Sequence, residues 1–196
     1  MAKQLRKTVI CLFRNDLRFH DNEVLLWAHR NGDHVVPMYC FDPDHFKGTW
    51  HFNFPKTGQH RAKFLLESVQ DFRKTLNNHR STLVVEQSKP LDCIKKVVDY
   101  CREASSPVVS VAYQKEVTYE ELRVENEIKN FCKSQNIQVV ELWGSTMYHQ
   151  DDLPFKSASD IPDTYTGFRK QVYYSHTLTF SSLDLYFTFQ TQAQHL

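Results

Sequence analysis

Apolar segments and mixed polar segments alternate along most of the chain. Five short segments are rich in Val, Ile and aromatic residues and nearly continuous in apolar character, as strands buried on both faces are. These predicted strands are Thr8–Phe13, His34–Phe41, Thr82–Gln87, Pro107–Tyr113 and Ile137–Trp143. Each is followed by a stretch that either repeats apolar residues at helical spacing or breaks the pattern with turn residues.

Helix starts can be recognised between the predicted strands. Asp21 is a candidate cap for a helix that stops at Gly32, and Ser88 precedes a Pro at an early helical position. Thr118 and Glu121 have capping-box spacing. A longer helix from about 59 to 76 carries an apolar stripe. The stripe consists of Phe64, Leu65, Val69, Phe72 and Leu76.

Strands and helices in strict alternation predict an α/β fold. We expect a doubly wound, Rossmann-like, five-stranded parallel sheet over residues 6–143. Residues 144–172 contain Pro154 and Pro162 and are predicted to be an extended interdomain linker. The last segment, 173–196, has no Lys, Arg, Gly or Pro and only one acid, Asp184, so we expect a divergent, unstructured tail.

Charge and cysteine content narrow the class of protein. Lys and Arg total 24 against 23 Asp and Glu, so nothing in the overall charge favours nucleic acid or an anionic membrane. The five cysteines are odd in number and scattered, which is typical of reduced core thiols. With no secretory signal and no apolar run of about 20 residues, we expect an intracellular protein with no membrane contact.

Motifs for the common chemistries of this fold are missing from the sequence. No glycine-rich dinucleotide loop follows the first strand, and neither a G-x-x-x-x-G-K-[ST] phosphate loop nor a G-x-S-x-G elbow is present. The ten histidines show no close metal-ligand spacing. We therefore predict no catalytic residue and no metal ligand.

Charged loop residues at strand ends are the remaining candidates, because open α/β sheets bind ligands there. Arg14, Asp16, Arg18 and Asp21 follow the first strand, and we expect them to form one hydrogen-bonded network of structural and interdomain importance. Glu116 follows the fourth strand, where its carboxylate could accept the amino and ring N–H groups of a flat heterocycle such as a pterin, or could simply be solvated or cap a helix.

Two further loops are less specific. Phe41 and Asp42 follow the second strand and are predicted, on fold geometry, to form another wall of the Glu116 site. Beyond them lies an aromatic loop with Trp50, Phe52 and Phe54. These rings could stack on a planar ligand or pack over the edge of the sheet.

Several ordered motifs together resemble the cryptochrome-DASH branch of the photolyase family. The opening loop reads F-R-x-D-L-R-x-x-D-N, and similar family-like runs occupy 56–73, 142–155 and 165–170. Together they cover residues 8 to about 172 in the family's order and spacing. In the Y-Q-x-E-V run, Glu116 falls on the family's antenna-binding glutamate.

The resemblance implies an amino-terminal antenna domain that holds 5,10-methenyltetrahydrofolate, with Lys115 as a weaker candidate for the folate's glutamate tail. In the family a helical domain follows and holds FAD, which repairs pyrimidine dimers in DNA using light; the DASH branch is similar to photolyases that prefer single strands. The resemblance thus implies a blue-light photoreceptor or photolyase, in the nucleus, cytoplasm or an organelle.

The chain departs from the family after Val172, where the tail replaces the expected start of the helical domain. We therefore expect this chain alone to bind folate weakly, to lack stoichiometric FAD, and to bind or repair no dimer-containing DNA. The alternative interpretation is a non-catalytic truncated isoform that acts as a folate-binding or partner-binding module.

Overall fold

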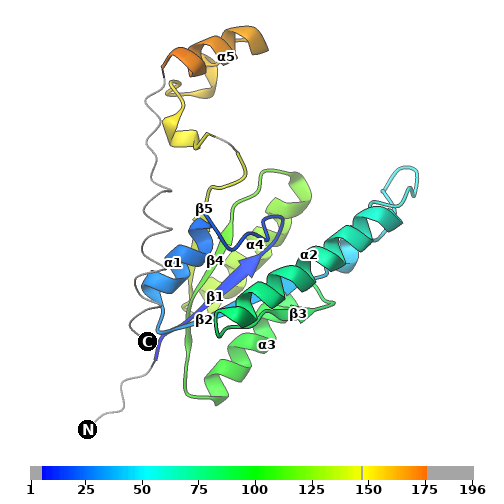
Figure 1. The fold of residues 1–196 in the computed structure, drawn as a ribbon, viewed down its shortest axis with the longest axis vertical. Helices are drawn as coiled ribbons and strands as arrows, with labels where there is room; N and C mark the ends of the chain where they lie inside the picture. The colour runs from blue at the N-terminus through cyan, green and yellow to red at the C-terminus, as the bar shows by residue number, and fades with distance from the viewer. Residues whose placement is uncertain (1–5, 147, 176–196) are drawn as a thin grey trace. The chain divides into compact units, whose positions relative to one another are not determined.

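The computed structural model describes residues 6–146 and 148–175, and its central feature is a five-stranded parallel sheet (Figure 1). The strand order is β3-β2-β1-β4-β5. The strands are β1 (Thr8–Phe13), β2 (His34–Cys40), β3 (Val84–Glu86), β4 (Val108–Gln114) and β5 (Gln138–Leu142). The predicted α/β class and doubly wound, parallel sheet are confirmed.

The strand order has one reversal, and it lies between β1 and β4. The chain moves outward from β1 to β2 and β3, and then returns to add β4 and β5 on the other side of β1. Leu12 of β1 is paired with Tyr113 of β4, so both strands end at the same edge. In sheets of this kind the loops at such a reversal diverge and leave room for a ligand.

Four helices cover the two faces of the sheet. Val9, Cys11 and Phe13 of β1 pack with helices α1 (Glu23–Asn31) and α2 (Gln59–Asn78) on one face. The alternate residues Ile10 and Leu12 pack with α3 (Pro90–Glu103) and α4 (Tyr119–Ser134) on the other. Because side chains of a strand alternate between faces, this near-continuous apolar strand serves two cores.

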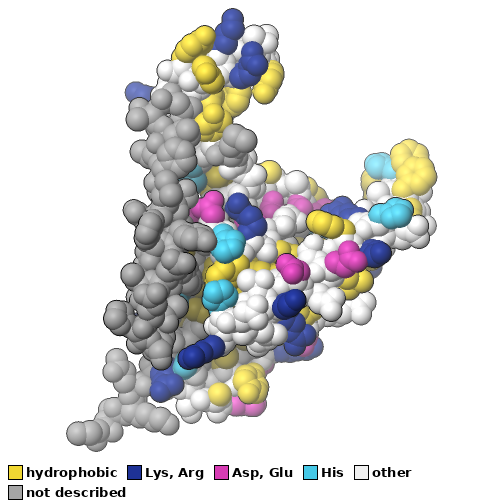
Figure 2. Space-filling view, viewed as in Figure 1, with side chains coloured by type: hydrophobic (Ala, Val, Ile, Leu, Met, Phe, Trp, Pro, Cys, Tyr) yellow, Lys and Arg dark blue, Asp and Glu magenta, His cyan; other side chains and the backbone are white. Residues whose placement is uncertain are grey.

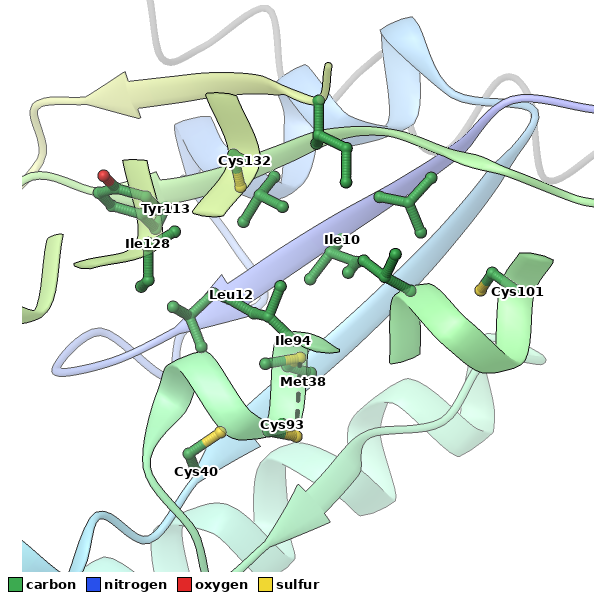
Figure 3. Close-up of a cluster of buried hydrophobic side chains, with 14 residues drawn as sticks. Ile10, Leu12, Met38, Cys40, Cys93, Ile94, Cys101, Tyr113, Ile128 and Cys132 are labelled. Atoms are coloured by element: carbon green, nitrogen blue, oxygen red, sulfur yellow. Dashed lines mark hydrogen bonds between the residues drawn. The ribbon is translucent and has the colours of Figure 1, made fainter. Parts of the chain in front are cut away.

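The core under α3 and α4 contains most of the thiols (Figure 3). Cys93 of α3 lies 3.9 Å from the Met38 sulfur, and Cys40, Cys101 and Cys132 belong to the same cluster. All five cysteines are free and buried, which confirms the prediction of core thiols without a disulfide frame. Burial raises the pKa of Cys132 to about 11, so this thiol stays protonated at neutral pH.

Two predicted helix caps differ from the structure. Asn22, not Asp21, caps α1 by accepting the backbone N–H of Leu25 at 2.9 Å. Asp21 has a φ of 51°, in the left-handed region, so it turns the chain one residue before the helix. Thr118 directly precedes α4 but makes no side-chain hydrogen bond to the helix, so the predicted capping box does not form. Pro90 is the first residue of α3, which confirms the predicted early position of this Pro.

Residues 143–175 form a unit separate from the sheet domain, and the prediction of an extended linker is wrong for its last part. Short 3-10 turns occupy Gln150–Asp152 and Ala158–Asp160, and helix α5 spans Tyr165–Tyr174. Thr164 caps α5 by accepting the Gly167 N–H, so the helix starts just beyond Pro162. The predicted tail therefore begins inside a helix, and residues 176–196 lie outside the described residues. No helix within the described ranges is long and apolar enough to cross a membrane.

The apolar stripe predicted on α2 is buried only at its carboxyl-terminal half. Val69, Phe72 and Leu76 are buried, whereas Phe64 is 70% exposed. The Phe72 ring meets the Phe13 ring edge-on with centroids 4.6 Å apart. The helix thus packs on the sheet with its second half, and its first half extends past the sheet edge.

Because of this difference, Phe72→Ala should lower the free energy of unfolding by about 3–5 kcal/mol, through loss of buried area and the cavity left behind. Phe64→Ala, the same change on the same helix, should cost about 0.5 kcal/mol or less. Urea unfolding of the two variants measures both values. Equal losses would contradict the packing described for α2.

Candidate functional site

A cleft of about 480 Å³ opens at the carboxyl edge of the sheet, beside β1 and β2. The ends of these strands form its floor, and the starts of α2 and α4 form its sides. Its polar and aromatic lining includes Arg14, Asn15, Tyr39, Asp42, Arg61 and Glu121. Burial raises the pKa of Tyr39 to about 12, with Arg61 acting in the opposite direction, so the phenol stays neutral in this cleft.

Glu116 lies just past the end of β4, as predicted, and its side chain is half-buried. Its Oε1 accepts a hydrogen bond from Nδ2 of Asn15 at 2.7 Å. No hydrogen bond from residues 6–146 or 148–175 reaches its Oε2. Glu116 is not among the residues that line the cleft; its contact with the cleft runs through Asn15, and it lies next to the reversal of strand order.

The predicted four-residue network in the opening loop is wrong for Arg14. Its guanidinium instead donates to Oε1 of Glu125 at 2.6 Å, and side-chain exposures of 12% and 1% make this a buried ion pair. The same oxygen accepts the backbone N–H of Glu116 at 2.9 Å. Sequence patterns alone did not single out Glu125 or Asn15, although a carboxylate in register with the core residues Ile128 and Cys132 is an unusual feature of a helix.

The other three residues of the opening loop do interact. Arg18 donates to both carboxylate oxygens of Asp16, at 3.0 and 3.1 Å, and lies 3.9 Å from Asp21. The hydrogen bond that Arg18 donates to Asp16 raises the pKa of Arg18. Since the Arg18 side chain is 56% exposed, the contacts among Asp16, Arg18 and Asp21 are surface ion pairs within the loop and not a buried network.

Phe41, Asp42 and Lys115 have different surroundings. Asp42 is 4% exposed and lines the cleft, where its carboxylate accepts the Asp44 N–H and caps a short 3-10 turn, Pro43–His45. Phe41 packs edge-on against the Tyr39 ring at 5.0 Å and is not part of the cleft wall. Lys115 is half-buried and also lies outside the cleft lining. Of the predicted wall, only Asp42 lines this cleft.

Most of the cleft's cations are already paired. Asp44 forms an ion pair with Lys47 at 2.6 Å and lies 3.9 Å from Arg123. The hydrogen bond that Lys47 donates lowers the pKa of Asp44. Lys56 donates to Glu120 at 2.6 Å. Within the part of the chain that the structure describes, Arg61 is a lining cation with no carboxylate within salt-bridge distance. An anionic ligand group would therefore find its least committed cation at Arg61.

The aromatic loop projects from the domain and does not pack over the sheet edge. Trp50, Phe52 and Phe54 are 89%, 75% and 65% exposed. An antiparallel bridge between Gly48 and Pro55 closes the loop at its base. Figure 2 shows apolar and histidine side chains gathered on this projection, which is the cyan loop of Figure 1. Among the three rings, Trp50 also lines the cleft.

No group of three His, Cys, Asp or Glu side chains in the described ranges could hold a metal ion. Cys40 lines the cleft, but a hydrogen bond with Cys93, and then burial, raise the pKa of its thiol. The chemistry available at this edge is therefore hydrogen bonding, stacking and charge pairing, which suits binding of a planar polar molecule.

Comparison with known proteins gives one consistent result. The family model for DNA photolyase matches residues 9–184. Cryptochrome DASH of Danio rerio is 51% identical over 166 residues, and that of Xenopus laevis 52%. The crystal structure of a cryptochrome from Synechocystis sp. PCC6803 superposes with a TM-score of 0.80 at 37% identity over 88% of this chain. The chain spans 31% of the length of both animal relatives and 34% of the cyanobacterial one.

The two ion pairs of the opening loop should differ sharply in their effect on stability. Arg14→Ala leaves the Glu125 carboxylate buried and unpaired, which should cost about 3–5 kcal/mol of unfolding free energy. Asp16→Ala frees only the exposed Arg18 and should cost about 1 kcal/mol or less. Urea denaturation of both variants checks this, and a larger loss for Asp16→Ala would refute the assignment of the buried pair.

Proposed function

Because the chain belongs to the DNA photolyase family, we propose that it is the antenna-chromophore domain of a cryptochrome-DASH-like protein and that it binds 5,10-methenyltetrahydrofolate. Members of the family bind FAD and antenna chromophores. This chain spans about a third of the length of its relatives. We therefore propose light reception or DNA repair only for a full-length protein that contains this domain.

The position of Glu116 carries the proposal. It lies beside the reversal of strand order, where open α/β sheets bind ligands. Asn15 holds one carboxylate oxygen, and the other oxygen has no hydrogen-bond partner within the described ranges. A pterin presents an amino group and a ring N–H side by side, and a carboxylate is the acceptor that matches such a pair. The donor set of the ligand therefore fits this residue.

The surroundings of Glu116 suggest how the rest of the folate is held. Asp42 would form part of the neighbouring wall, and Tyr39 or Trp50 could stack on the planar portion. For the anionic glutamate tail, Arg61 is favoured over Lys115, because Arg61 lines the cleft and has no carboxylate partner in residues 6–146 or 148–175. When bound, methenyltetrahydrofolate supplies absorption of near-ultraviolet and blue light, which the family transfers to FAD.

A second candidate function is binding of a protein partner by a module without catalysis. Three large aromatic side chains on one closed loop, all more than half exposed, favour it. Clusters of exposed aromatic side chains of this kind are characteristic of interaction surfaces. An absorption spectrum of the purified chain tells bound flavin from bound folate and from no chromophore.

Glu116→Gln should weaken the binding of methenyltetrahydrofolate about tenfold or more, since the charged acceptor of the pterin donors is lost, at about 1.5–3 kcal/mol. Fluorescence or absorbance titration of the purified chain measures the affinity. The matched control is Glu127→Gln on the exposed face of α4, where the carboxylate lies 3.9 Å from Arg123. Unchanged affinity in Glu116→Gln would exclude Glu116 as the anchor.

A further inference from the structure

Glu125 is a fully buried carboxylate that touches both loops of the proposed site. It belongs to α4 and is 0% exposed. Its Oε1 accepts from Arg14, in the loop after β1, at 2.6 Å, and from the backbone N–H of Glu116, after β4, at 2.9 Å. A single oxygen atom therefore joins the two strand ends that flank the reversal of strand order.

The contacts of Glu125 form a closed ring. Arg14 is followed directly by Asn15, and Nδ2 of Asn15 donates to Oε1 of Glu116 at 2.7 Å. The ring thus runs from Glu125 to Arg14, through the chain to Asn15, across to the Glu116 side chain, and back through the Glu116 N–H. Glu125 therefore contacts the Glu116 main chain directly, and it is linked to the Glu116 carboxylate through Arg14 and Asn15.

Stability alone does not account for a carboxylate at this position. The second oxygen of Glu125 is buried and has no hydrogen-bond partner within the described ranges. An unpartnered buried oxygen is costly, and buried ion pairs replaced by apolar side chains often leave a protein equally or more stable. Two apolar side chains in place of Arg14 and Glu125 would leave the Glu116 N–H without its acceptor. They would also remove the contact that joins the loop after β1 to α4.

We propose that Glu125 is a positioning residue for the chromophore anchor, which fixes the main chain of Glu116 and, through Arg14 and Asn15, the orientation of its carboxylate. This inference rests on the proposed folate site for its purpose, but its geometry is independent of any ligand. Glu125 acts on the ligand only through Glu116. A pre-set acceptor loses little conformational entropy on binding, and this preorganisation favours affinity.

The first test needs no ligand. In the NMR spectrum of the chain, Glu125→Gln should move the Glu116 amide proton upfield, because a charged acceptor becomes a neutral one, and should speed its exchange with solvent. The control Glu127→Gln, on the exposed face of the same helix, should leave this resonance in place. An unmoved Glu116 amide in Glu125→Gln would overturn the proposal whatever the ligand does.

The second test uses methenyltetrahydrofolate as the probe. Glu125→Gln should weaken its binding about tenfold and shift the absorption band of the bound ligand toward that of the free compound, since the carboxylate is no longer held in place. If Glu116→Gln weakens binding but Glu125→Gln changes neither affinity nor band position, positioning by Glu125 is wrong and the folate site stands. If Glu116→Gln has no effect, the folate site itself fails, while the amide measurement still decides the role of Glu125.

A paired variant separates positioning from stability. Glu125→Gln leaves Arg14 with a neutral partner and could lower stability, so Arg14→Leu with Glu125→Leu removes both buried charges at once. This double variant should unfold at a midpoint near that of the unmodified chain, while the Glu116 amide, which has lost its acceptor, should exchange faster with solvent and the probe should bind more weakly. Full affinity in a stable double variant would contradict the inference.

Discussion

The carboxyl ends of β1 and β4 are tied together by a buried ion pair, and the candidate site depends on it. Each of these neighbouring parallel strands ends in a loop that would diverge from the other, since strand order reverses at this point. Glu125 opposes that divergence by holding Arg14 of one loop and the Glu116 backbone of the other. The sheet supplies proximity, and the buried carboxylate supplies a defined geometry.

The other features at the carboxyl edge of the sheet either hold the loops in place or form the surface that a ligand would contact. The exposed Arg18 holds the opening loop through Asp16 and contributes little stability, whereas the buried Asp42 caps the short turn after β2. The cleft beside β2 combines a neutral phenol, several ion pairs, and Arg61, which has no carboxylate within salt-bridge distance among the described residues. The projecting aromatic loop carries three of the domain's exposed large apolar side chains. A ligand or partner at this edge would therefore meet a preformed floor with an exposed apolar rim.

Periodicity was sufficient to predict the strands and the doubly wound sheet, because a parallel strand such as Thr8–Phe13 is buried at every position and apolar at all but the first. Periodicity did not predict where the helices begin or which charged side chains form ion pairs. Asp21 and Asn22 are equally good caps by residue type, and backbone conformation decided for Asn22. The partner of Arg14 lies 111 residues away, so no local pattern could identify Glu125. Position after a buried strand and the family resemblance both pointed to Glu116, whereas only the structure shows which residues contact it.

The most direct test of the central claim is a crystal structure of this chain soaked with 5,10-methenyltetrahydrofolate at saturating concentration. We expect pterin density within hydrogen-bond distance of the Glu116 carboxylate, with the contacts from Asn15 to Glu116 and from Glu116 to Glu125 still present. Pterin density at full occupancy that lies elsewhere, for example wholly inside the cleft against Tyr39 and without contact to Glu116, would contradict it.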